Sequence, residues 1–446
     1  MSELSDMSKP HDDGFPISKI NKLLHEIVDY IVELNKFQYY KGQMSFYEDE
    51  YGFHRLIDTD DEWAEISAFL DDDIIANFMP KDIKTLLDML RLDQRLRREC
   101  DFNPHLKLIN TKNGAVNVIT HELYPHNSRF EFTSCVNAEY CDGVTIDDAP
   151  TFKRFCKTSL NGDPANEKLL LQIIGYICSS YTGAKKAFLF VGEKNSGKSK
   201  ILEFIQWLLG IANVCNIPLH KLGNRFNIAQ LSRHKVNIQA ELSLEPLREI
   251  ETFKNAVGGD WLCGEDKGKP LFHFKNMCKF IFAGNGVPVL KSQDTTQAFI
   301  SRLIFLIFPK EIPEDERDTE LLDKLYEERD IIFSLAVNEL RELIENNFKF
   351  EVPELSAKYL QGYSEQNNSI NEFLGELCIF GTDYKVFSRD LYDAYKKFCA
   401  DNCFFAHSEF AFLNAVASHE NILRERITMD GKRLRGFVGI GLKKSI

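Results

Sequence analysis

The octapeptide GEKNSGKS at residues 192–199 restricts the possible folds of this chain more than any other feature. Gly192, four further residues, and then Gly197, Lys198 and Ser199 have the spacing of a P-loop, whose backbone N–H groups turn inward around a phosphate. The run AFLFV before it is typical of a buried parallel strand, and KSKILEFIQWLL after it has helical periodicity up to Gly210. Strand, glycine-rich loop and helix predict an α/β nucleotide-binding core, whereas a purely structural turn would leave Lys198 unexplained.

The P-loop assignment predicts an individual role for several side chains. Lys198 would contact the β- and γ-phosphates of ATP, and the hydroxyl of Ser199 would bind Mg²⁺. The predicted ATP-binding residues are Gly192, Glu193, Lys194, Asn195, Ser196, Gly197, Lys198, Ser199 and Lys200.

Three predicted strands follow the P-loop helix, at residues 235–242, 279–283 and 303–308. Each has a polar residue at one end. Glu241 would polarise a water molecule or help to hold Mg²⁺, Asn285 would hydrogen-bond that water or the γ-phosphate, and Arg302 would serve as an arginine finger for a neighbouring subunit. Taken singly, these residues are also consistent with a surface Glu, a turn Asn and an ordinary surface Arg. Taken together and in this order, they favour a ring-forming ATPase.

Charge is distributed unevenly along the chain. The whole sequence carries a net charge of −13, yet residues 181–309 hold 17 Lys and Arg against 10 Asp and Glu, which is +7 and leaves −20 for the remainder. A locally basic segment can bind a phosphate backbone even in an acidic protein. Ordinary surface scatter of charges is the alternative explanation.

Composition excludes several protein classes. With 44% hydrophobic residues among 446, the chain is expected to fold into several domains rather than to be disordered. No apolar run approaches the roughly 18 residues of a membrane span, and the polar, acidic N-terminus is not a signal peptide. No membrane partner is therefore expected. The 11 Cys are scattered without zinc-ligand spacing, and their odd number in a chain without a signal peptide predicts reduced thiols in the cytoplasm.

The rest of the chain shows alternating helical and hairpin patterns. Helices are predicted at 17–37, 61–70, 81–98, 151–180 and 315–347, hairpins at 37–56 and 106–127, and a linker at 365–369. In the second hairpin, Asn113–Gly114 is the predicted turn.

The C-terminal segment has a pattern of its own. Amphipathic stretches at 369–380, 388–402 and 408–419 precede two strands around Asp430–Gly431, which is the plan of a winged helix. Residues 408–418 would be the recognition helix. Because this helix has few basic residues, Lys432, Arg433 and Arg435 on the wing would make most phosphate contacts. A winged helix that binds protein instead is the alternative.

Five segments carry a resemblance to a known family: GEKNSGKS, QAELS, FKNAVGGD, IFAGNGVP and SRLIFLIFP, in this order over residues 192–309. They resemble the superfamily 3 helicases, in particular the phage and plasmid primase–helicases related to the poxvirus enzyme. The hairpin at 106–127 with the helix that follows, and the C-terminal winged helix, are also similar to that family. The resemblance extends from Leu106 to the end of the chain.

The resemblance implies an AAA+ motor in a homohexameric ring that encircles single-stranded DNA and moves 3′ to 5′. It implies that Glu241 is the Walker B acid, Asn285 the sensor and Arg302 the finger in trans. Lys254 would approach the nucleotide of a neighbour, and Lys267 and Lys269 would lie at the tip of a pore hairpin. Glu241 stands alone where many relatives have two adjacent acids, and Glu265 and Asp266 offset the charge of the hairpin lysines.

The predicted domains are a mainly helical N-terminal domain (1–105), a β/α region (106–165), the motor (166–312), a helical segment (313–365) and the winged helix (366–446). The region before 106 is too short for a primase domain, so no primase activity is expected.

The predicted function is an ATP- and Mg²⁺-dependent 3′–5′ DNA helicase for replication of a phage, virus, satellite or plasmid. Its expected partners are single-stranded DNA, origin duplex and a separate primase or loader. The alternative is a nucleotide-gated DNA-binding or defence ATPase without productive unwinding. A small-molecule P-loop kinase would leave the winged helix and Arg302 without a role.

Overall fold

The computed structural model describes residues 17–40, 43–98, 103–244, 247, 250–268, 270–288, 296–366, 369–402, 404, 406–417, 419, 421–429 and 431–443. The chain divides into two compact units, residues 1–142 and 143–446. Within the described ranges, no helix combines the length and the apolar character that a membrane span requires.

The described residues of unit 1 form two small antiparallel sheets and four α-helices. Its elements are α1 (Ile17–Glu33), β1 (Phe37–Tyr40), β2 (Gln43–Glu48), β3 (Phe53–Ile57), α2 (Glu62–Ser67), α3 (Asp72–Ile75), α4 (Pro80–Leu92), β4 (Leu108–Thr111), β5 (Gly114–Asn117) and β6 (Leu123–Tyr124). The first sheet has the order β1-β2-β3. Ile27 and Ile31, one helical turn apart on α1, are fully buried in the same core as Leu86 and Leu90 of α4.

The structure corrects two predictions in unit 1. The helix predicted at 81–98 ends at Leu92, because the backbone of Asp93 is extended. The hairpin of β4 and β5 pairs Thr111 with Gly114, so its two turn residues are Lys112 and Asn113. The turn therefore lies one residue before the predicted Asn113–Gly114.

Unit 2 is built on a parallel five-stranded sheet. Its first part contains α5 (Pro150–Ser159), α6 (Pro164–Cys178), β7 (Ala187–Gly192), α7 (Lys198–Leu209), β8 (Val214–Cys215), α8 (Arg225–Leu231), β9 (Val236–Gln239), α9 (Glu251–Gly258), β10 (Trp261–Gly264), β11 (Phe272–Lys275), β12 (Lys279–Gly284), α10 (Thr296–Ile300), β13 (Leu303–Phe308), α11 (Leu321–Glu327), α12 (Arg329–Glu345) and α13 (Glu354–Gln366). The strand order is β13-β7-β12-β9-β8, and every neighbouring pair is parallel.

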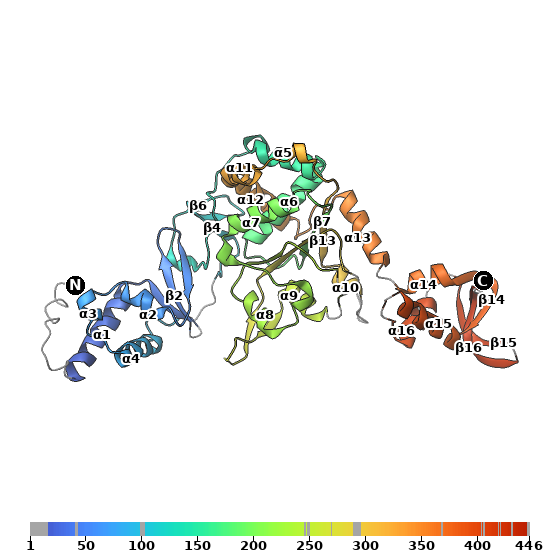
Figure 1. The fold of residues 1–446 in the computed structure, drawn as a ribbon, viewed down its shortest axis with the longest axis horizontal. Coiled ribbons are helices and arrows are strands. Elements are labelled where there is room, and N and C mark those ends of the chain that lie inside the picture. The colour runs from blue at the N-terminus through green and yellow to red at the C-terminus, as the bar shows by residue number, and fades with distance from the viewer. Residues whose placement is uncertain are drawn as a thin grey trace. The chain divides into compact units, whose positions relative to one another are not determined.

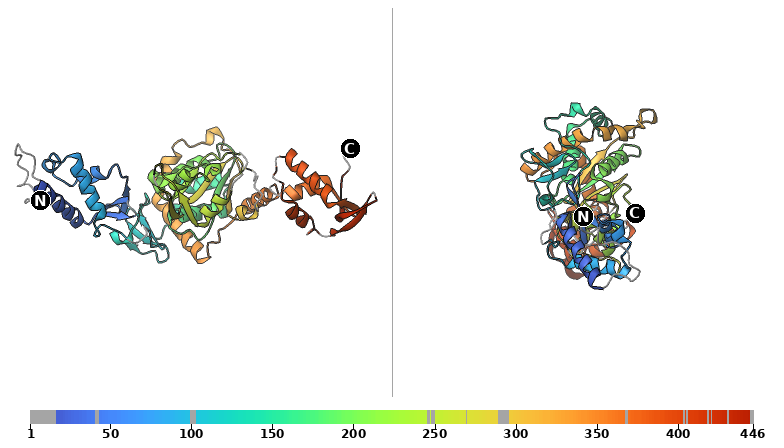
Figure 2. Two further views of the ribbon diagram at one scale, coloured as in Figure 1. Left: turned by 90° about the horizontal axis from the view of Figure 1, so that it is seen from below. Right: turned by 90° about the vertical axis from the view of Figure 1, so that its left-hand side faces the viewer.

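Helices cover both faces of this sheet, which explains why its strands read as continuous apolar runs (Figure 1). On one face, Phe253 of α9 packs against Phe280 and Phe282 of β12. On the other face, Tyr176 of α6 packs edge-to-face against Phe188 of β7. Figure 2 shows the same sheet and its helices from two further directions.

The single helix predicted at 151–180 is wrong, because the structure has two helices there. Asn161 and Gly162 both have positive φ angles, of 62° and 65°, which ends α5. The side chain of Asp163 then accepts a hydrogen bond from the N–H of Ala165, and Pro164 occupies the first turn of α6.

The C-terminal part of unit 2 contains α14 (Ser369–Leu377), β14 (Cys378–Phe387), α15 (Ser388–Asp401), α16 (Glu409–Ala417), β15 (Leu423–Met429) and β16 (Lys432–Leu442). The three predicted helices and the final hairpin are present, and the strands form an antiparallel sheet in the order β14-β16-β15. The sequence did not predict β14, whose first residues had been assigned to the preceding helix.

Candidate nucleotide site and charged surfaces

The P-loop residues connect β7 to α7 in a tightly packed turn. A Cβ atom on Gly192 would lie 2.0 Å from the carbonyl oxygen of Phe308, and one on Gly197 would lie 2.5 Å from Ser159 Oγ. Gly197 also has a φ of +96°, a conformation that other residues rarely adopt. Both glycines of the predicted motif are therefore required by the geometry of the loop.

Lys198 lies in the first turn of α7 and is 8% exposed. Its ammonium donates hydrogen bonds to the carbonyl of Gly192 at 2.8 Å, to the carbonyl of Glu193 and to Ser196 Oγ at 3.1 Å. Burial lowers the pKa of Lys198, while the nearby Glu193 carboxylate acts in the opposite direction. The amine thus donates hydrogen bonds to groups of the loop, and an incoming phosphate could replace these acceptors.

The loop and the helix that follows suit an anion. The first turn of α7 contains no acidic side chain, and its free N–H groups and helix dipole favour negative charge. Ser199, Glu193, Lys194 and Asn195 are exposed, and Lys200 is half-buried beside Glu203. These features fit ATP with Mg²⁺: the loop has no room for Cβ atoms at Gly192 and Gly197, Lys198 supplies an amine, and Ser199 supplies a hydroxyl. Ser199 and Glu241 would hold the Mg²⁺.

The strand order brings Asn285 and Glu241 to the same end of the sheet as the P-loop. Strand β12 pairs with β7 on one side, with Gly284 opposite Val191, and with β9 on the other. Asn285 follows Gly284 directly, and its side chain is exposed. The carboxyl ends of these three strands therefore form one edge that contains the loop and Asn285.

Glu241 lies two residues beyond the end of β9, not at the end of the strand as predicted. Its segment nevertheless stays close to the sheet, because the N–H of Leu242 donates to the carbonyl of Ala283 at 2.6 Å. The side-chain amide of Gln239 also donates to the carbonyl of Glu241 at 2.8 Å. The backbone of Glu241 is fixed in this way while its carboxylate remains exposed.

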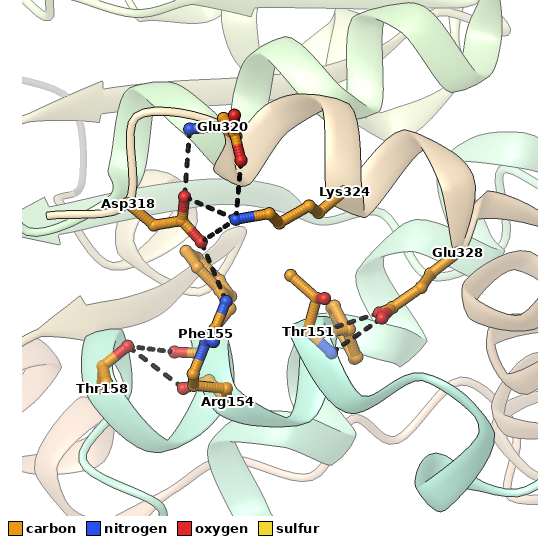
Figure 3. A network of polar contacts seen from close by, with 9 residues as sticks. Thr151, Arg154, Phe155, Thr158, Asp318, Glu320, Lys324 and Glu328 are labelled. Carbon is orange, nitrogen blue, oxygen red and sulfur yellow. Dashed lines mark hydrogen bonds and ion pairs between the residues drawn. The ribbon is translucent and has the colours of Figure 1, made fainter.

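Helix α5 packs against the P-loop. It is itself held by the segment after the sheet (Figure 3). Phe155 and Ser159 are the α5 residues that crowd Gly197. The carboxylate of Glu328 accepts hydrogen bonds from the N–H groups of Thr151 and Phe152, both at 2.8 Å, at the first turn of α5. Sequence analysis missed Glu328, since nothing in the local pattern links it to a helix 176 positions earlier.

Two ion pairs that share the carboxylate of Asp318 also hold α5. Arg154 on α5 binds Asp318 at 2.9 Å, and Lys324 binds the same carboxylate at 3.0 Å (Figure 3). The hydrogen bond from Lys324 lowers the pKa of Asp318. On the loop itself, Asn195 donates to Glu311 at 2.9 Å and accepts from the N–H of Ile312. Two segments that follow β13 therefore position the P-loop.

Arg302 lies at the opposite end of the sheet. Strand β13 pairs with β7 from Leu303 opposite Ala187 to Phe308 opposite Gly192, so Arg302 is roughly 15–20 Å of strand away from the P-loop. Its guanidinium donates to the carbonyls of Lys254 and Ala298. The structure thus brings together Arg302 and Lys254, the two residues predicted to contact a neighbour's nucleotide, and separates them from the nucleotide loop of their own chain.

The predicted pore hairpin is formed by β10 and β11, which pair antiparallel. Lys267 is exposed at its tip, whereas Lys269 lies outside the described residues. The neighbouring acids are paired with arginines from outside the hairpin: Arg225 binds Glu265 at 2.7 Å and Arg233 binds Asp266. The expectation of a locally neutral tip is therefore wrong, because residues about 30–40 positions earlier contribute two positive charges.

A second basic surface lies on the hairpin of β15 and β16. Lys432, Arg433 and Arg435 are exposed there, and Arg435 lies directly opposite Arg426. Arg424 is on the same face of β15, donates to Asn414 of α16 at 3.2 Å and lies over the ring of Phe437. Sequence analysis missed Arg424 and Arg426, although their alternation in LRERITM indicates that they share one face of a strand.

Comparisons with known proteins match most of this architecture. Residues 18–160 match the family described as D5 N terminal like, and residues 190–302, from β7 to Arg302, match a family of unknown function, DUF5906. Among described residues, no group of three or more His, Cys, Asp and Glu could hold a metal ion.

Solved structures of one protein share the fold. An A-form apo structure of the NrS-1 C-terminal region is 11% identical, covers 92% of this chain and 98% of that one, and has a TM-score of 0.54. Another apo structure of the same region, 305–718, has 11% identity, the same coverage and a TM-score of 0.51. The family match over the first third of the chain and this similarity of fold lead to one conclusion: the chain is related to the phage and viral primase–helicases.

Proposed function

We propose that this chain is an ATP-dependent DNA helicase of the superfamily 3 type, which moves 3′ to 5′ during replication of a phage, virus, satellite or plasmid. The observation that carries the proposal is the position of β12 between β7 and β9. This order gathers the P-loop, Asn285 and Glu241 at one edge, as hydrolysis of a nucleotide requires. The opposite edge carries Arg302 and Lys254, which are suited to act on the nucleotide of another subunit.

Each residue of the loop has a task in ATP binding. The Lys198 ammonium would exchange its loop carbonyls for the β- and γ-phosphate oxygens, and the N–H groups of residues 193–199 would surround the β-phosphate. Ser199 and Glu241 would hold Mg²⁺, which when bound neutralises charge between the two terminal phosphates. Glu241 would also accept a proton from the attacking water, which Asn285 would orient.

Arg302 would complete the site of a neighbouring subunit in a homohexamer. In this proposal the guanidinium leaves the carbonyls of Lys254 and Ala298, or shares them, to stabilise the charge that develops on the γ-phosphate. Lys254 would approach the same nucleotide, since its backbone carbonyl lies within hydrogen-bond distance of Arg302. Each nucleotide site would then be complete only when the neighbouring subunit of the ring is in place.

DNA would be bound at two places. Lys267, and Lys269 beside it in sequence, would contact phosphates of a single strand inside the ring. The C-terminal part would act as a winged helix in which Lys432, Arg433 and Arg435 contact duplex, for example at an origin. A separate primase or loader would be its protein partner in replication.

Strand displacement tests the proposal directly. We expect unwinding of a duplex with a 3′ single-stranded tail in the presence of ATP and Mg²⁺, no unwinding from a 5′ tail, and loss of unwinding in Lys198→Ala. Hydrolysis of ATP without displacement from either tail would instead support a nucleotide-gated DNA-binding ATPase. The engagement of Arg302 by carbonyls of its own chain is the observation that favours this second candidate.

Mixing two inactive variants tests the role of Arg302 in trans. Arg302→Ala should retain ATP binding but lose DNA-stimulated hydrolysis by about 10³-fold or more. Adding Lys198→Ala subunits should restore part of the activity, because some interfaces then combine an intact Lys198 with an intact Arg302. Arg341→Ala, in an exposed pair on α12, is the matched control. No recovery on mixing would contradict action in trans.

A further inference from the structure

The hairpin of β10 and β11 has two faces of different character. Its inner face packs on α8: Leu262 is buried, and a Cβ atom on Gly264 would lie 2.9 Å from the Cα of Ala229. Leu262 and Gly264 pair with Phe274 and Phe272, which therefore share that face. Because side chains alternate along a strand, the neighbouring residues point to the other side.

The outer face presents an indole to solvent. Trp261 is 67% exposed and lies directly opposite Lys275, and one step along the hairpin Cys263 lies opposite His273. Directly opposed Cβ atoms on antiparallel strands are about 4.5–5.5 Å apart, so the side chains of Trp261 and Lys275 leave the same face of the hairpin as neighbours. Within the part of the chain that the structure describes, no ion pair engages Lys275. An exposed Trp, a Lys and an imidazole therefore form one continuous surface, which we call the outer hairpin face (Trp261, His273 and Lys275).

The charge around this face favours an anion. Glu265 and Asp266, the acids of the hairpin, are paired with Arg225 and Arg233. The remaining charged side chains of the described hairpin residues are the cations Lys267 and Lys275. A partner that combines flat apolar rings with negative charge matches both the indole and the lysines, and a single-stranded nucleic acid has this composition.

We propose that the outer hairpin face binds single-stranded DNA, with a base stacked on the indole of Trp261 and the adjoining phosphate beside Lys275. This inference rests on the proposed function, in which the same hairpin faces the strand. Stacking on an indole does not discriminate strongly between bases, which suits a protein that must travel along any sequence. Lys275 supplies the part of the affinity that depends on salt, and Trp261 supplies the part that does not.

Equilibrium binding to the full chain separates these two contributions. The probe is a fluorescein-labelled oligo-dT, titrated at several salt concentrations with a non-hydrolysable ATP analogue. Trp261→Leu should weaken binding about 5- to 150-fold at each salt concentration without changing the salt dependence. Lys275→Gln should weaken binding and reduce the slope of log affinity against log salt by about 0.7.

Two further variants control for simple loss of surface or fold. Trp261→Phe keeps an aromatic ring and should retain most of the affinity. Ile211→Ala removes an apolar side chain that is 72% exposed outside the hairpin and should leave binding unchanged. If Trp261→Leu binds oligo-dT as tightly as the unaltered chain, the proposal is overturned.

Fluorescence gives a second readout that leaves Trp261 itself unaltered. The chain has three Trp, so Trp63→Phe with Trp207→Phe leaves Trp261 as its one indole. Saturating oligo-dT should quench this fluorescence through stacking. Binding without any quenching would overturn the proposal, as would a Trp261→Leu variant that alters sedimentation but not DNA affinity, since the face would then contact a neighbouring subunit.

The outcome is distinguishable from failure of the proposed function. Oligo-dT binding that depends on Trp261, together with no strand displacement, would refute the motor and support the stacking surface. Normal displacement and normal affinity in Trp261→Leu would refute the stacking surface and leave the motor intact.

Discussion

The two ends of the parallel sheet in unit 2 use polar side chains in opposite ways. At the carboxyl end, Ser199, Glu241 and Asn285 are exposed. At the amino end, cations donate to carbonyls of the same chain: Lys186 to Ser301, Lys279 to Ser179, and Arg302 to Lys254 and Ala298. Apart from Lys198, whose ammonium donates to carbonyls of the P-loop, the polar groups named at the carboxyl end are accessible to a ligand, whereas those at the amino end satisfy backbone acceptors.

This difference follows from the direction of the chain. In a parallel sheet with helical crossovers, helices end near the amino ends of strands, where their last carbonyls lack partners. Lys279 illustrates the result, since its ammonium bonds to Ser179, the residue that caps the C-terminus of α6. Cations are favoured at such positions, so a row of basic residues there is a consequence of the fold and not by itself a binding site.

The largest expected effect is at the carboxyl end. Lys198→Ala should reduce ATP hydrolysis by about 100-fold or more, because a positioned charge on the transferred phosphate is lost. The free energy of unfolding should change little, because a partly desolvated amine is removed together with its bonds. Phosphate release and urea denaturation measure the two quantities, and Lys221→Ala, exposed after β8, is the control. Unchanged hydrolysis would mean that the carboxyl end is not the ATP site.

Two carboxylates in unit 2, those of Glu241 and Glu328, should differ in the same way. Glu241→Gln should reduce ATP hydrolysis by about 100-fold with little change in stability, because its side chain is exposed. Glu328→Gln should instead cost about 1–2 kcal/mol of unfolding free energy, since the carboxylate that caps α5 loses its charge. Glu327→Gln, at the exposed neighbouring position, should do neither. If Glu241→Gln lost stability and Glu328→Gln lost hydrolysis, the exposure of a carboxylate would not distinguish functional from structural acids in this unit.

The parts of the molecule that could be predicted are those determined by local sequence. The apolar runs of β7, β12 and β13 were located to within a residue, because a strand buried on both faces has no other pattern. The α5–α6 break was missed because apolar residues continue through 151–180 and conceal the Asn161–Gly162 turn.

What could not be predicted depends on contacts between distant segments. The pairing of Arg302 with Lys254 spans 48 positions, and the salt bridges of Arg225 and Arg233 to the hairpin acids reverse an estimate made from local charge alone. Trp261 reads as an ordinary strand residue, and its exposure is known only when the inner face of the hairpin is assigned to α8. The roles of the site residues stay predictions until hydrolysis is measured.

Lys279 provides a smaller effect that depends on pH. Burial, with Lys235 as the second cause, lowers the pKa of Lys279 to about 7 in the folded chain, against an ordinary value near 10.4. The unfolded chain therefore binds more protons above pH 7, so the free energy of unfolding rises with pH. Between pH 6.5 and 8, this rise should be about 1 kcal/mol larger in the unaltered chain than in Lys279→Met. Urea denaturation at both pH values measures this difference, and an equal rise in the two chains would show that folding does not lower the pKa of Lys279.

Lys186, also at the amino end, should show the weakest phenotype. Its ammonium donates to the carbonyl of Ser301, and burial together with the nearby Arg302 lowers its pKa. If Lys186 serves only to satisfy this carbonyl, Lys186→Met should cost less than about 1 kcal/mol of unfolding free energy and leave ATP hydrolysis unchanged. The exposed neighbour provides the control, Lys185→Met, which should change neither. A stable Lys186→Met chain with lost hydrolysis would place a second functional cation beside Arg302, in the site that Arg302 is proposed to complete for a neighbouring subunit.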